Sequence, residues 1–404
     1  MRLGIDLTNL DPKYKGGSNT YCEGFIEGLK ENNNSKISIQ IYTNKDYFKN
    51  NKFKKKNFIF YTYNPTILKK IFIIIYNRLF PFLSFFIGDL KYSFDYYFRN
   101  FLYSNFKKLV EKNSDILITP NVTLKIYNLS IPTITNLHDI QHIHYPELFS
   151  FSEKCRRDFS YSNTAKYSSK IIASLNFIKK DLRNQFRFLK SNKIEVIYAG
   201  VDLKKYRYNK KAKTKNYIFF PAQLWPHKNH LLVINAFRNY LKKSKKKNKL
   251  YMSGKNFGQQ SQKILNNIET IDNNYIKFLG PIDHSSLLNM YNSAICTLCP
   301  AIYEASALPM LESFSMKTNV MISDIKQHLE ESKKFKVINF KTNSAKDLEE
   351  KFLSLDKYSH KKLKSITDFN YNLIKKRSWA LQSKKWILIC QKLLKKNNIS
   401  SKLT

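Results

Sequence analysis

Acidic residues are scarce in this chain of 404 residues. Asp and Glu number 30 against 70 Lys and Arg, so the formal net charge is +40. Such a charge fits nucleic acid, an anionic membrane or an anionic small substrate, and lysine spread along the whole chain also fits plain compositional drift. Because no helix-turn-helix, RNA-recognition or zinc-finger pattern occurs, we expect no nucleic-acid partner.

Cysteine is equally sparse. The chain has five, Cys22, Cys155, Cys296, Cys299 and Cys390. Cys296 and Cys299 form a C-x-x-C inside an apolar run with no second pair, so buried thiols are favoured over zinc or redox use. The chain opens directly on a strand, with nothing that resembles a secretory signal, and we therefore expect a reduced, cytoplasmic setting.

Apolar runs alternate with helical spacing along the chain in two successive series. The length predicts two domains, and the alternation predicts an α/β fold in which each domain is a doubly wound, Rossmann-like sheet. We predict an N-terminal domain over 1–204, a basic linker over 205–215, and a C-terminal domain over 216–370. A helical segment over 371–404 is expected to pack back across the domains, with Trp379 and Trp386 available for packing.

One stretch breaks this rhythm. Ile67 to Leu90 is dense in Ile and Phe, with Arg78 in its middle and Pro81 shortly after. These two residues argue against a simple transmembrane span. The alternatives are an element lying on a membrane or lining a groove for a lipid acceptor, ordinary core, or a span. A further helix is predicted over 92–112.

Two carboxylates flank a turn of small residues in the second half of the chain. Glu304 and Glu312 lie on either side of Ala305-Ser306-Ala307-Leu308-Pro309, after the apolar strand predicted at 294–299. Pro309 suits the first turn of a helix. A helix start favours a phosphate, whereas carboxylates accept hydrogen bonds from hydroxyls such as those of a sugar.

Three more candidate groups follow predicted strands. Gly16-Gly17 would let the backbone approach a ligand or adopt a positive φ, although such a pair is also ordinary turn punctuation. His138-Asp139 follows an apolar strand, and a metal site with His142 and His144 is the weaker alternative. Lys228 lies near a helix start, where an anionic ligand would explain a cation, although a surface lysine is the simpler explanation. We expect all four groups around one cleft between the two sheets.

Taken together, these segments resemble a retaining, family-4-type glycosyltransferase of the GT-B fold. The resemblance rests on the Gly-Gly turn, His138-Asp139, the segment PAQLWPHKNH (221–230) and YEASALPMLES (303–313), and the second segment is similar to bacterial mannosyltransferase-like members. It implies an acceptor-binding N-terminal domain and a C-terminal domain that binds a nucleotide sugar. It also implies catalytic roles for His138, Glu304 and Lys228, with Glu304 on the donor sugar and Lys228 on the diphosphate. The remaining substrate-binding residues would be Gly16, Gly17, Asp139, Gln223, Ser306, Ala307, Leu308 and Glu312.

This chain departs from the family pattern at two places. Ala305-Ser306-Ala307 replaces a glycine-rich turn, and Gln223 stands where an Arg usually partners the Lys. The backbone N–H groups of Ala307 and Leu308 could still serve the diphosphate. No D-x-D tripeptide occurs, so no visible motif requires a divalent metal, and we expect no metal and no cofactor besides the donor.

The resemblance implies transfer of a hexose, mannose from GDP-mannose as the best guess, to a saccharide or lipid-linked acceptor. Assembly of cell-surface polysaccharide or lipopolysaccharide, on the inner face of the cytoplasmic membrane and in contact with its anionic lipids, is the expected setting. An inactive GT-B protein that binds a nucleotide sugar or a partner is the main alternative. A sugar-nucleotide epimerase of the same fold would need no acceptor.

Overall fold

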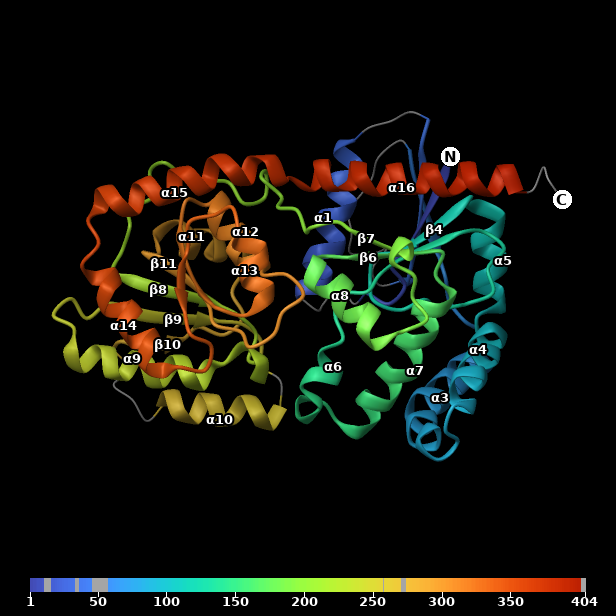
Figure 1. Ribbon diagram of the computed structural model, residues 1–404, viewed down its shortest axis with the longest axis horizontal. Coiled ribbons are helices and arrows are strands. Elements are labelled where there is room, and N and C mark those ends of the chain that lie inside the picture. The colour runs from blue at the N-terminus through green and yellow to red at the C-terminus, as the bar shows by residue number, and fades with distance from the viewer. Residues whose placement is uncertain (11–15, 33–35, 46–56, 257, 270–273, 401–404) are drawn as a thin grey trace. The chain divides into compact units, whose positions relative to one another are not determined.

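The computed structural model describes residues 1–10, 16–32, 36–45, 57–256, 258–269 and 274–400. They form two compact units, one of Met1–Tyr198 with Trp379–Thr404 and one of Ala199–Ser378. Each is an α/β unit built on a parallel sheet (Figure 1). The predicted fold class, two doubly wound Rossmann-like sheets, is confirmed.

The first unit contains a sheet of seven parallel strands in the order β3-β2-β1-β4-β5-β6-β7. Its strands are β1 (Arg2–Asp6), β2 (Ser38–Thr43), β3 (Phe58–Thr62), β4 (Ile116–Thr119), β5 (Thr133–Asn136), β6 (Lys170–Ala173) and β7 (Ile194–Val196). Its helices are α1 (Gly17–Glu31), α3 (Ile67–Phe86), α4 (Leu90–Leu102), α5 (Ser104–Asn113), α6 (Gln141–His144), α7 (Phe151–Tyr167), α8 (Asn176–Gln185) and α16 (Trp379–Ser400). The order reverses between β1 and β4, where parallel α/β sheets bind ligands.

The second unit contains six parallel strands in the order β10-β9-β8-β11-β12-β13. They are β8 (Tyr217–Pro221), β9 (Lys249–Ser253), β10 (Ile276–Phe278), β11 (Cys296–Cys299), β12 (Asn319–Ser323) and β13 (Ile338–Phe340). The helices are α9 (His230–Lys243), α10 (Gly258–Glu269), α11 (His284–Ser293), α12 (Leu308–Ser315), α13 (Lys326–Ser332), α14 (Ala345–Asp356) and α15 (His360–Ile374). Here the order reverses between β8 and β11.

Alternation along the buried strands divides each core between the two faces of its sheet. In the second unit Ile218 and Phe220 of β8 pack with α9, α10 and α14, whereas Phe219 lies on the other face against Tyr291 of α11. Buried strands with both faces covered read as continuous apolar runs, which is why they were recognisable in the sequence. Cys296 and Cys299 are buried free thiols in β11.

The last helix of the chain belongs to the first unit. α16 packs along α1, where Phe25 meets Trp386 and Tyr21 meets Trp379 (Figure 1). The contact is close, because a Cβ on Gly28 would lie 2.4 Å from the carbonyl oxygen of Trp379. The basic segment after Asp202 packs on the second unit instead, through Tyr206 against His284 and Tyr291.

One local expectation was wrong, and one alternative for the apolar stretch is excluded. The helix predicted over 92–112 is broken at Tyr103, which ends α4 and precedes α5. The apolar stretch Ile67 to Leu90 is not ordinary core, because most of its large side chains are exposed. It forms α3 and the start of α4. Along the described part of the chain, no helix is long and apolar enough to span a membrane.

Candidate active site

The turn between β11 and α12 carries the two candidate carboxylates of the second unit. α12 begins at Leu308 with Pro309 in its first turn, as the fixed φ of proline favours. The turn is fastened to the neighbouring loop, since the N–H of Ile302 donates to the carbonyl of His227 over 2.9 Å. Because β8 and β11 are adjacent, both loops lie at the point where the strand order reverses.

Lys228 and Glu304 meet across these two loops. The Lys228 ammonium forms an ion pair with Glu304 Oε1, and both side chains are largely buried. On the other side of the same carboxylate, His328 Nε2 lies 4.0 Å from Glu304 Oε2. Burial lowers the pKa of His328, so its ring is neutral at pH 7. Glu304 is thus held between a cation and a neutral imidazole.

Glu312 is placed differently. It lies on α12 with 8% of its surface exposed, and the hydroxyl of Tyr291 donates to its Oε2 over 2.7 Å. Burial raises the pKa of this carboxyl, against the hydrogen bonds from Tyr206 and Tyr291. Because a carboxylate offers about four lone-pair sites, Glu312 could accept a further hydroxyl besides those of the two tyrosines.

A third carboxylate, absent from the sequence-based prediction, organises the turn between them. Glu331 of α13 accepts hydrogen bonds from the Ser306 hydroxyl at 2.8 Å and the Ala307 N–H at 2.6 Å, and it pairs with Arg377 at 2.6 Å. The Leu308 N–H donates to the carbonyl of Ser306 at 3.1 Å. The two N–H groups expected to face a diphosphate are therefore engaged within the protein.

The loop after β8 explains the position of Lys228. A 3-10 turn over Pro226–Lys228 leads to Asn229, whose φ of 63° is left-handed, and α9 begins at His230. In the same loop, Gln223 Oε1 accepts a hydrogen bond from the indole N–H of Trp225 at 2.9 Å.

The first unit holds the other candidates at the carboxyl edge of its own sheet. Gly16 precedes α1 in an extended conformation, with φ −128°, and Gly17 starts the helix. The expected positive φ was wrong. No described atom lies within 4 Å of a Cβ built on Gly17.

His138 lies two residues after β5 and contacts Asn136 and Tyr21. Its Nδ1 is 3.2 Å from Asn136 Nδ2, and its ring meets Tyr21 edge-on at 4.9 Å. Burial lowers the pKa of His138, opposed by Asp139 and the carbonyl of Pro120, so the ring is neutral. If Asn136 donates to Nδ1, the ring proton is on Nε2 and can be donated to a substrate oxygen.

Asp139 and the two nearby histidines have structural partners. Asp139 Oδ1 accepts the N–H of Gln141 at 3.0 Å and so begins α6. Burial lowers the pKa of His142 to about 3, and His144 Nε2 contacts Asp181 at 2.8 Å. In the ranges that the structure describes, no group of three or more His, Cys, Asp or Glu side chains could hold a metal ion.

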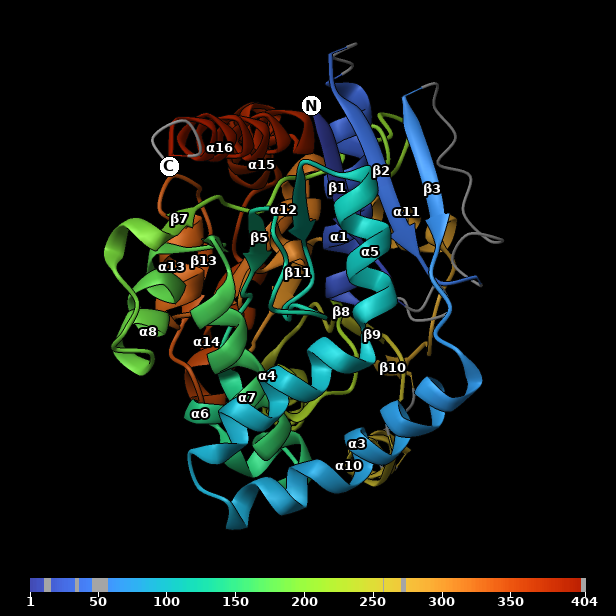
Figure 2. The same cartoon turned by 90° about the vertical axis from the view of Figure 1, so that its right-hand side faces the viewer.

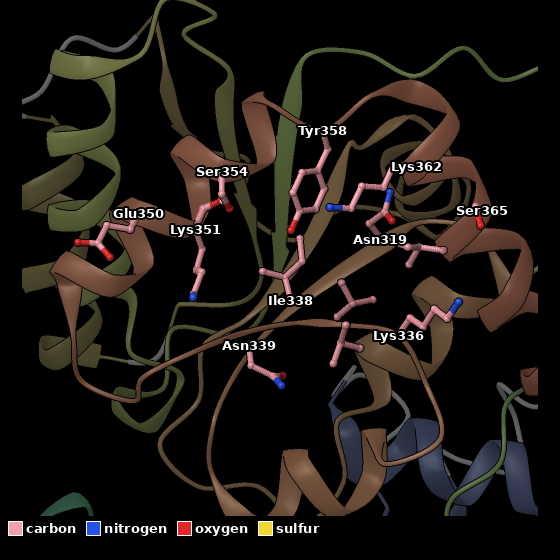
Figure 3. Close-up of a pocket in the computed structure, with 13 residues that line it drawn as sticks. Asn319, Lys336, Ile338, Asn339, Glu350, Lys351, Ser354, Tyr358, Lys362 and Ser365 are labelled. Carbon is pink, nitrogen blue, oxygen red and sulfur yellow. The ribbon is translucent and has the colours of Figure 1, made fainter.

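A cavity of about 810 Å³ lies elsewhere in the second unit. It is bounded by the amino ends of β12 and β13, at Asn319 and Ile338, and by side chains of α14 and α15 such as Lys351 and Lys362 (Figure 3). This is the edge of the sheet opposite to Glu304, so the cavity is no part of the candidate site.

Sequence reasoning found the motif residues and missed three that hold them. His328, Glu331 and Arg377 reach the site through contacts far apart in the sequence. Nothing in the local pattern of α13 distinguishes Glu331, which is buried, from its neighbour Glu330. Only the fold identifies these partners.

The sequence pattern of the family "Glycosyl transferases group 1" matches residues 203–372. The O-antigen chain mannosyltransferase RfbU of Salmonella typhimurium is 27% identical over 215 residues. The alignment covers 53% of this chain and 57% of that relative, so it spans little more than half of either protein.

Solved structures match over almost the whole chain. Anabaena HepE (Alr3699), crystallised with UDP and glucose, has a TM-score of 0.70 at 13% identity, and the match covers 97% of this chain and 99% of HepE. A glycosyltransferase of Rickettsia africae has a TM-score of 0.68 at 16% identity, covering 98% of both chains. Trehalose-6-phosphate synthase OtsA has a TM-score of 0.71 at 12% identity, covering 97% and 99%.

These likenesses show a common fold, and the match to the family lies in the second unit, which contains Lys228, Glu304 and Glu312. Residues 203–372 of this chain are thus similar to the group 1 glycosyltransferases, and its two parallel sheets match structures of the GT-B fold.

Proposed function

We propose that this protein is a retaining glycosyltransferase that moves a hexose from a nucleoside-diphosphate sugar to a hydroxyl of a saccharide or lipid-linked acceptor. The observation that carries the proposal is the ion pair of Lys228 with Glu304 at the strand-order reversal of the second unit. Lys228 would supply a cation for a diphosphate, and Glu304 would accept hydrogen bonds from sugar hydroxyls. Both lie where α/β sheets bind nucleotides.

Lys228 would stabilise the charge that develops on the departing diphosphate. Preorganised donors and cations at such a position act where the charge builds up, and they typically contribute about 10²–10³-fold to the rate. A diphosphate would compete with Glu304 for the ammonium, so donor binding would shift Lys228 from the carboxylate towards the phosphates. Glu304 would then be free to accept a hydroxyl of the donor sugar.

Glu312 would bind the ribose. Its raised pKa and its partner Tyr291 leave it able to exchange hydrogen bonds with a diol, and it lies on α12, one helical turn after Leu308. The Ala307 and Leu308 N–H groups would reach a phosphate only if the turn were rearranged away from Glu331 and Ser306. Gln223, Ser306 and the backbone near them would line the donor subsite.

The neutral His138 would donate from Nε2 to a sugar or acceptor oxygen, and Asp139 and Gly16-Gly17 of the same unit would also contact substrate. Its lowered pKa supports a hydrogen-bonding role at pH 7 rather than that of a cation. We propose no metal in the reaction, since the sequence contains no D-x-D tripeptide.

Mannose from GDP-mannose is the proposed donor, and assembly of lipopolysaccharide or another surface polysaccharide is the proposed setting. The name of the relative RfbU supports both. UDP-glucose is the competing donor, since HepE was crystallised with UDP and glucose.

A donor panel tests the proposal. The purified protein is incubated with GDP-mannose, UDP-glucose and other nucleotide sugars, together with saccharide and lipid-linked acceptors, and products are identified by mass and anomeric configuration. An α-linked product from an α-linked donor supports retention. Release of the inverted sugar or absence of any product with every donor would contradict the proposal.

An inactive protein of the same fold is the second candidate. The observation that favours it is the engagement of the Ala307 and Leu308 N–H groups within the turn. It predicts that calorimetry detects donor binding while no acceptor yields a product.

A further inference from the structure

The pair of helices α3 and α4, with the side chains that face away from the protein, forms the apolar hairpin. Of the 20 residues of α3, eleven are large hydrophobic side chains that are exposed, and four more follow on α4. They are Ile67, Leu68, Ile71, Phe72, Ile74, Ile75, Leu79, Phe82, Leu83, Phe85 and Phe86 on α3, and Leu90, Phe94, Tyr97 and Phe101 on α4. Several are exposed for more than two thirds of their surface, with Phe86 at 80%, Ile67 at 77% and Leu68 at 70%.

Such a surface is unusual for a monomer in water. The largest apolar patches of soluble monomers are a few hundred Å² and commonly mark an interaction site. On α3 the exposed apolar residues cover roughly half of the helix circumference at 100° per residue. α3 is amphipathic in the opposite sense to a helix on the surface of a soluble protein. Its apolar side faces outwards, and its inward stripe carries the hydrogen-bonding groups.

The inward stripe is Tyr76, Phe80 and Ser84, spaced by four residues on one side of α3. Tyr76 and Phe80 pack on Phe159 of α7, with ring centroids 6.4 and 4.9 Å apart. One side of α3 is therefore committed to the protein. A helix held in this way can lie on a bilayer with its other side but cannot cross it.

A buried carboxylate fixes the apolar hairpin to the unit. Asp95 of α4 is fully buried and accepts hydrogen bonds from the hydroxyls of Tyr76 and Tyr127, from Arg99 Nε at 2.8 Å and from Asn163 at 2.7 Å. These donors come from α3, α4, the loop after β4 and α7. If α3 turned its exposed side inwards, this buried carboxylate would lose the hydrogen bond from Tyr76.

The charges around the apolar side are mostly basic, with one exposed carboxylate, Asp89, between α3 and α4. Lys70 and Arg78 are exposed on α3, and the helix contains no Asp or Glu. Lys91 follows on α4, where it pairs with Asp158. Cations that flank an apolar helix face are attracted to the anionic headgroups of a membrane. Each cation contributes about as much binding free energy as one ion pair screened by water and salt. The net charge of +40 favours the same surface.

We propose that the apolar hairpin inserts into one leaflet of an anionic lipid bilayer and holds the first unit on the membrane as a monotopic element. Leu68, Leu79 and Phe86 enter the boundary between headgroups and acyl chains, while Lys70 and Arg78 reach the headgroups. The committed inward stripe keeps α3 parallel to the surface.

The apolar hairpin lies at a particular edge of the sheet of the first unit. β3 ends at Thr62 and α3 starts at Ile67, so the apolar hairpin lies on the side of the sheet where the parallel strands end, beyond β3 (Figures 1 and 2). His138 also follows the carboxyl end of a strand of this sheet. If the proposed function holds, membrane attachment presents this edge to acceptors carried by lipids. The binding itself does not depend on that function.

The test uses the full chain and vesicles of stated composition. Co-sedimentation is measured with vesicles of phosphatidylcholine alone and of phosphatidylcholine with phosphatidylglycerol. We expect binding to the mixed vesicles and at least tenfold weaker binding for the triple variant Leu68→Ser/Leu79→Ser/Phe86→Ser, with unchanged far-ultraviolet circular dichroism. Lys70→Gln/Arg78→Gln should weaken binding to the mixed vesicles alone.

Matched controls lie in the same unit. Phe188→Ser and Leu388→Ser remove apolar side chains that are 51% and 55% exposed outside the apolar hairpin, and both should bind as the unmodified protein does. A tryptophan placed by Ile75→Trp should shift its emission to the blue on binding, which reports insertion rather than surface adsorption.

Three results would overturn the proposal. The triple variant could bind the mixed vesicles as tightly as the unmodified protein, or the emission of Ile75→Trp could stay unshifted. Alternatively, sedimentation without lipid could show a dimer that the triple variant dissociates, which would make the apolar hairpin a surface for a second copy of the chain. Each result is distinct from failure of the donor panel, which measures transfer only.

Discussion

The ion pair of Lys228 with Glu304 is asymmetric in its surroundings. The Lys228 side chain is 21% exposed and that of Glu304 only 7%, so the ammonium can reach water more easily than the carboxylate. Removing one partner of a buried pair leaves the other uncompensated, and the cost depends on how far the remaining group can be solvated.

We predict that Lys228→Met costs more stability than Glu304→Gln. Lys228→Met leaves Glu304 as a buried unpaired carboxylate and should lower the free energy of unfolding by about 3 kcal/mol. Glu304→Gln leaves a cation that can turn to solvent and should cost about 1 kcal/mol. Urea denaturation of both variants and of the double variant measures this, and the double variant should recover part of the larger loss. Equal costs for the two single changes would contradict this account of the pair.

A second residue-scale prediction concerns His230, which is buried and stacks on Phe220 with centroids 4.4 Å apart. Burial lowers its pKa from 6.5 to about 3. Between these values the unfolded chain binds a proton that the folded chain does not, so the stability from a neutral His230 is complete above pH 6.5. It is lost progressively as the pH falls towards 3, by at most about 1.4 kcal/mol per pH unit.

The variant His230→Phe should therefore lose less stability on acidification. We expect a smaller drop in Tm between pH 7 and pH 5 than in the unmodified protein, measured by calorimetry. His328 in the same unit also has a lowered pKa. It therefore adds a loss of stability on acidification that is the same in both proteins. A drop of the same size in the variant would show that His230 does not carry the effect.

At the scale of elements, the contact of α1 with α16 depends on two glycines. A Cβ on Gly24 would lie 2.1 Å from the Trp379 indole nitrogen, and one on Gly28 would lie 2.4 Å from the Trp379 carbonyl oxygen. A side chain can move aside more easily than backbone can. Gly28→Ala is thus the sharper probe of how the end of the chain is held on the first unit.

We predict that Gly28→Ala destabilises the first unit by about 1–3 kcal/mol, the usual cost of overpacking, although alanine favours the helix itself. Gly17→Ala is the matched control, because no described atom lies within 4 Å of its Cβ position and it starts the same helix. Thermal unfolding should separate the two variants by several degrees. A Tm for Gly28→Ala equal to that of Gly17→Ala would mean that α16 shifts without a loss of stability, and it would contradict the prediction.

The elements that the sequence predicted well are those with a local cause. Strands such as β8 and β11 are apolar runs covered on both faces, and Pro309 marks the first turn of α12. The break at Tyr103 and the shape of the 305–307 turn have no such local cause. The first depends on packing, and the second depends on Glu331 and Arg377, which approach from distant parts of the chain.

The sequence predicted that α3 is apolar, but it did not decide between a place in the core, on a membrane or lining a groove. Arg78 and Pro81 argued against a span, and an element lying on a membrane or lining a groove and ordinary core both remained as alternatives. Burial of Tyr76 and Phe80 on α7 fixes which side of the helix faces the protein. The side that remains exposed follows from tertiary packing, which the sequence of so apolar a helix does not reveal.

At the scale of the whole molecule, two α/β units of the GT-B fold carry a large positive charge, an apolar hairpin on the first unit and a carboxylate-lysine pair in the second. The proposed donor site and the proposed membrane contact use different units. They can therefore fail separately, and variants of the apolar hairpin should keep the ability to bind a nucleotide sugar.

The central claim is that Glu304 orients the sugar of a nucleotide-sugar donor for transfer. The most direct measurement is the rate of hexose transfer by the unmodified protein, by Glu304→Ala, and by Glu350→Ala, which removes an exposed carboxylate at the opposite edge of the same sheet. We predict a loss of at least about a hundredfold for Glu304→Ala with unchanged circular dichroism, and full activity for Glu350→Ala. Full transfer activity in Glu304→Ala would contradict the account.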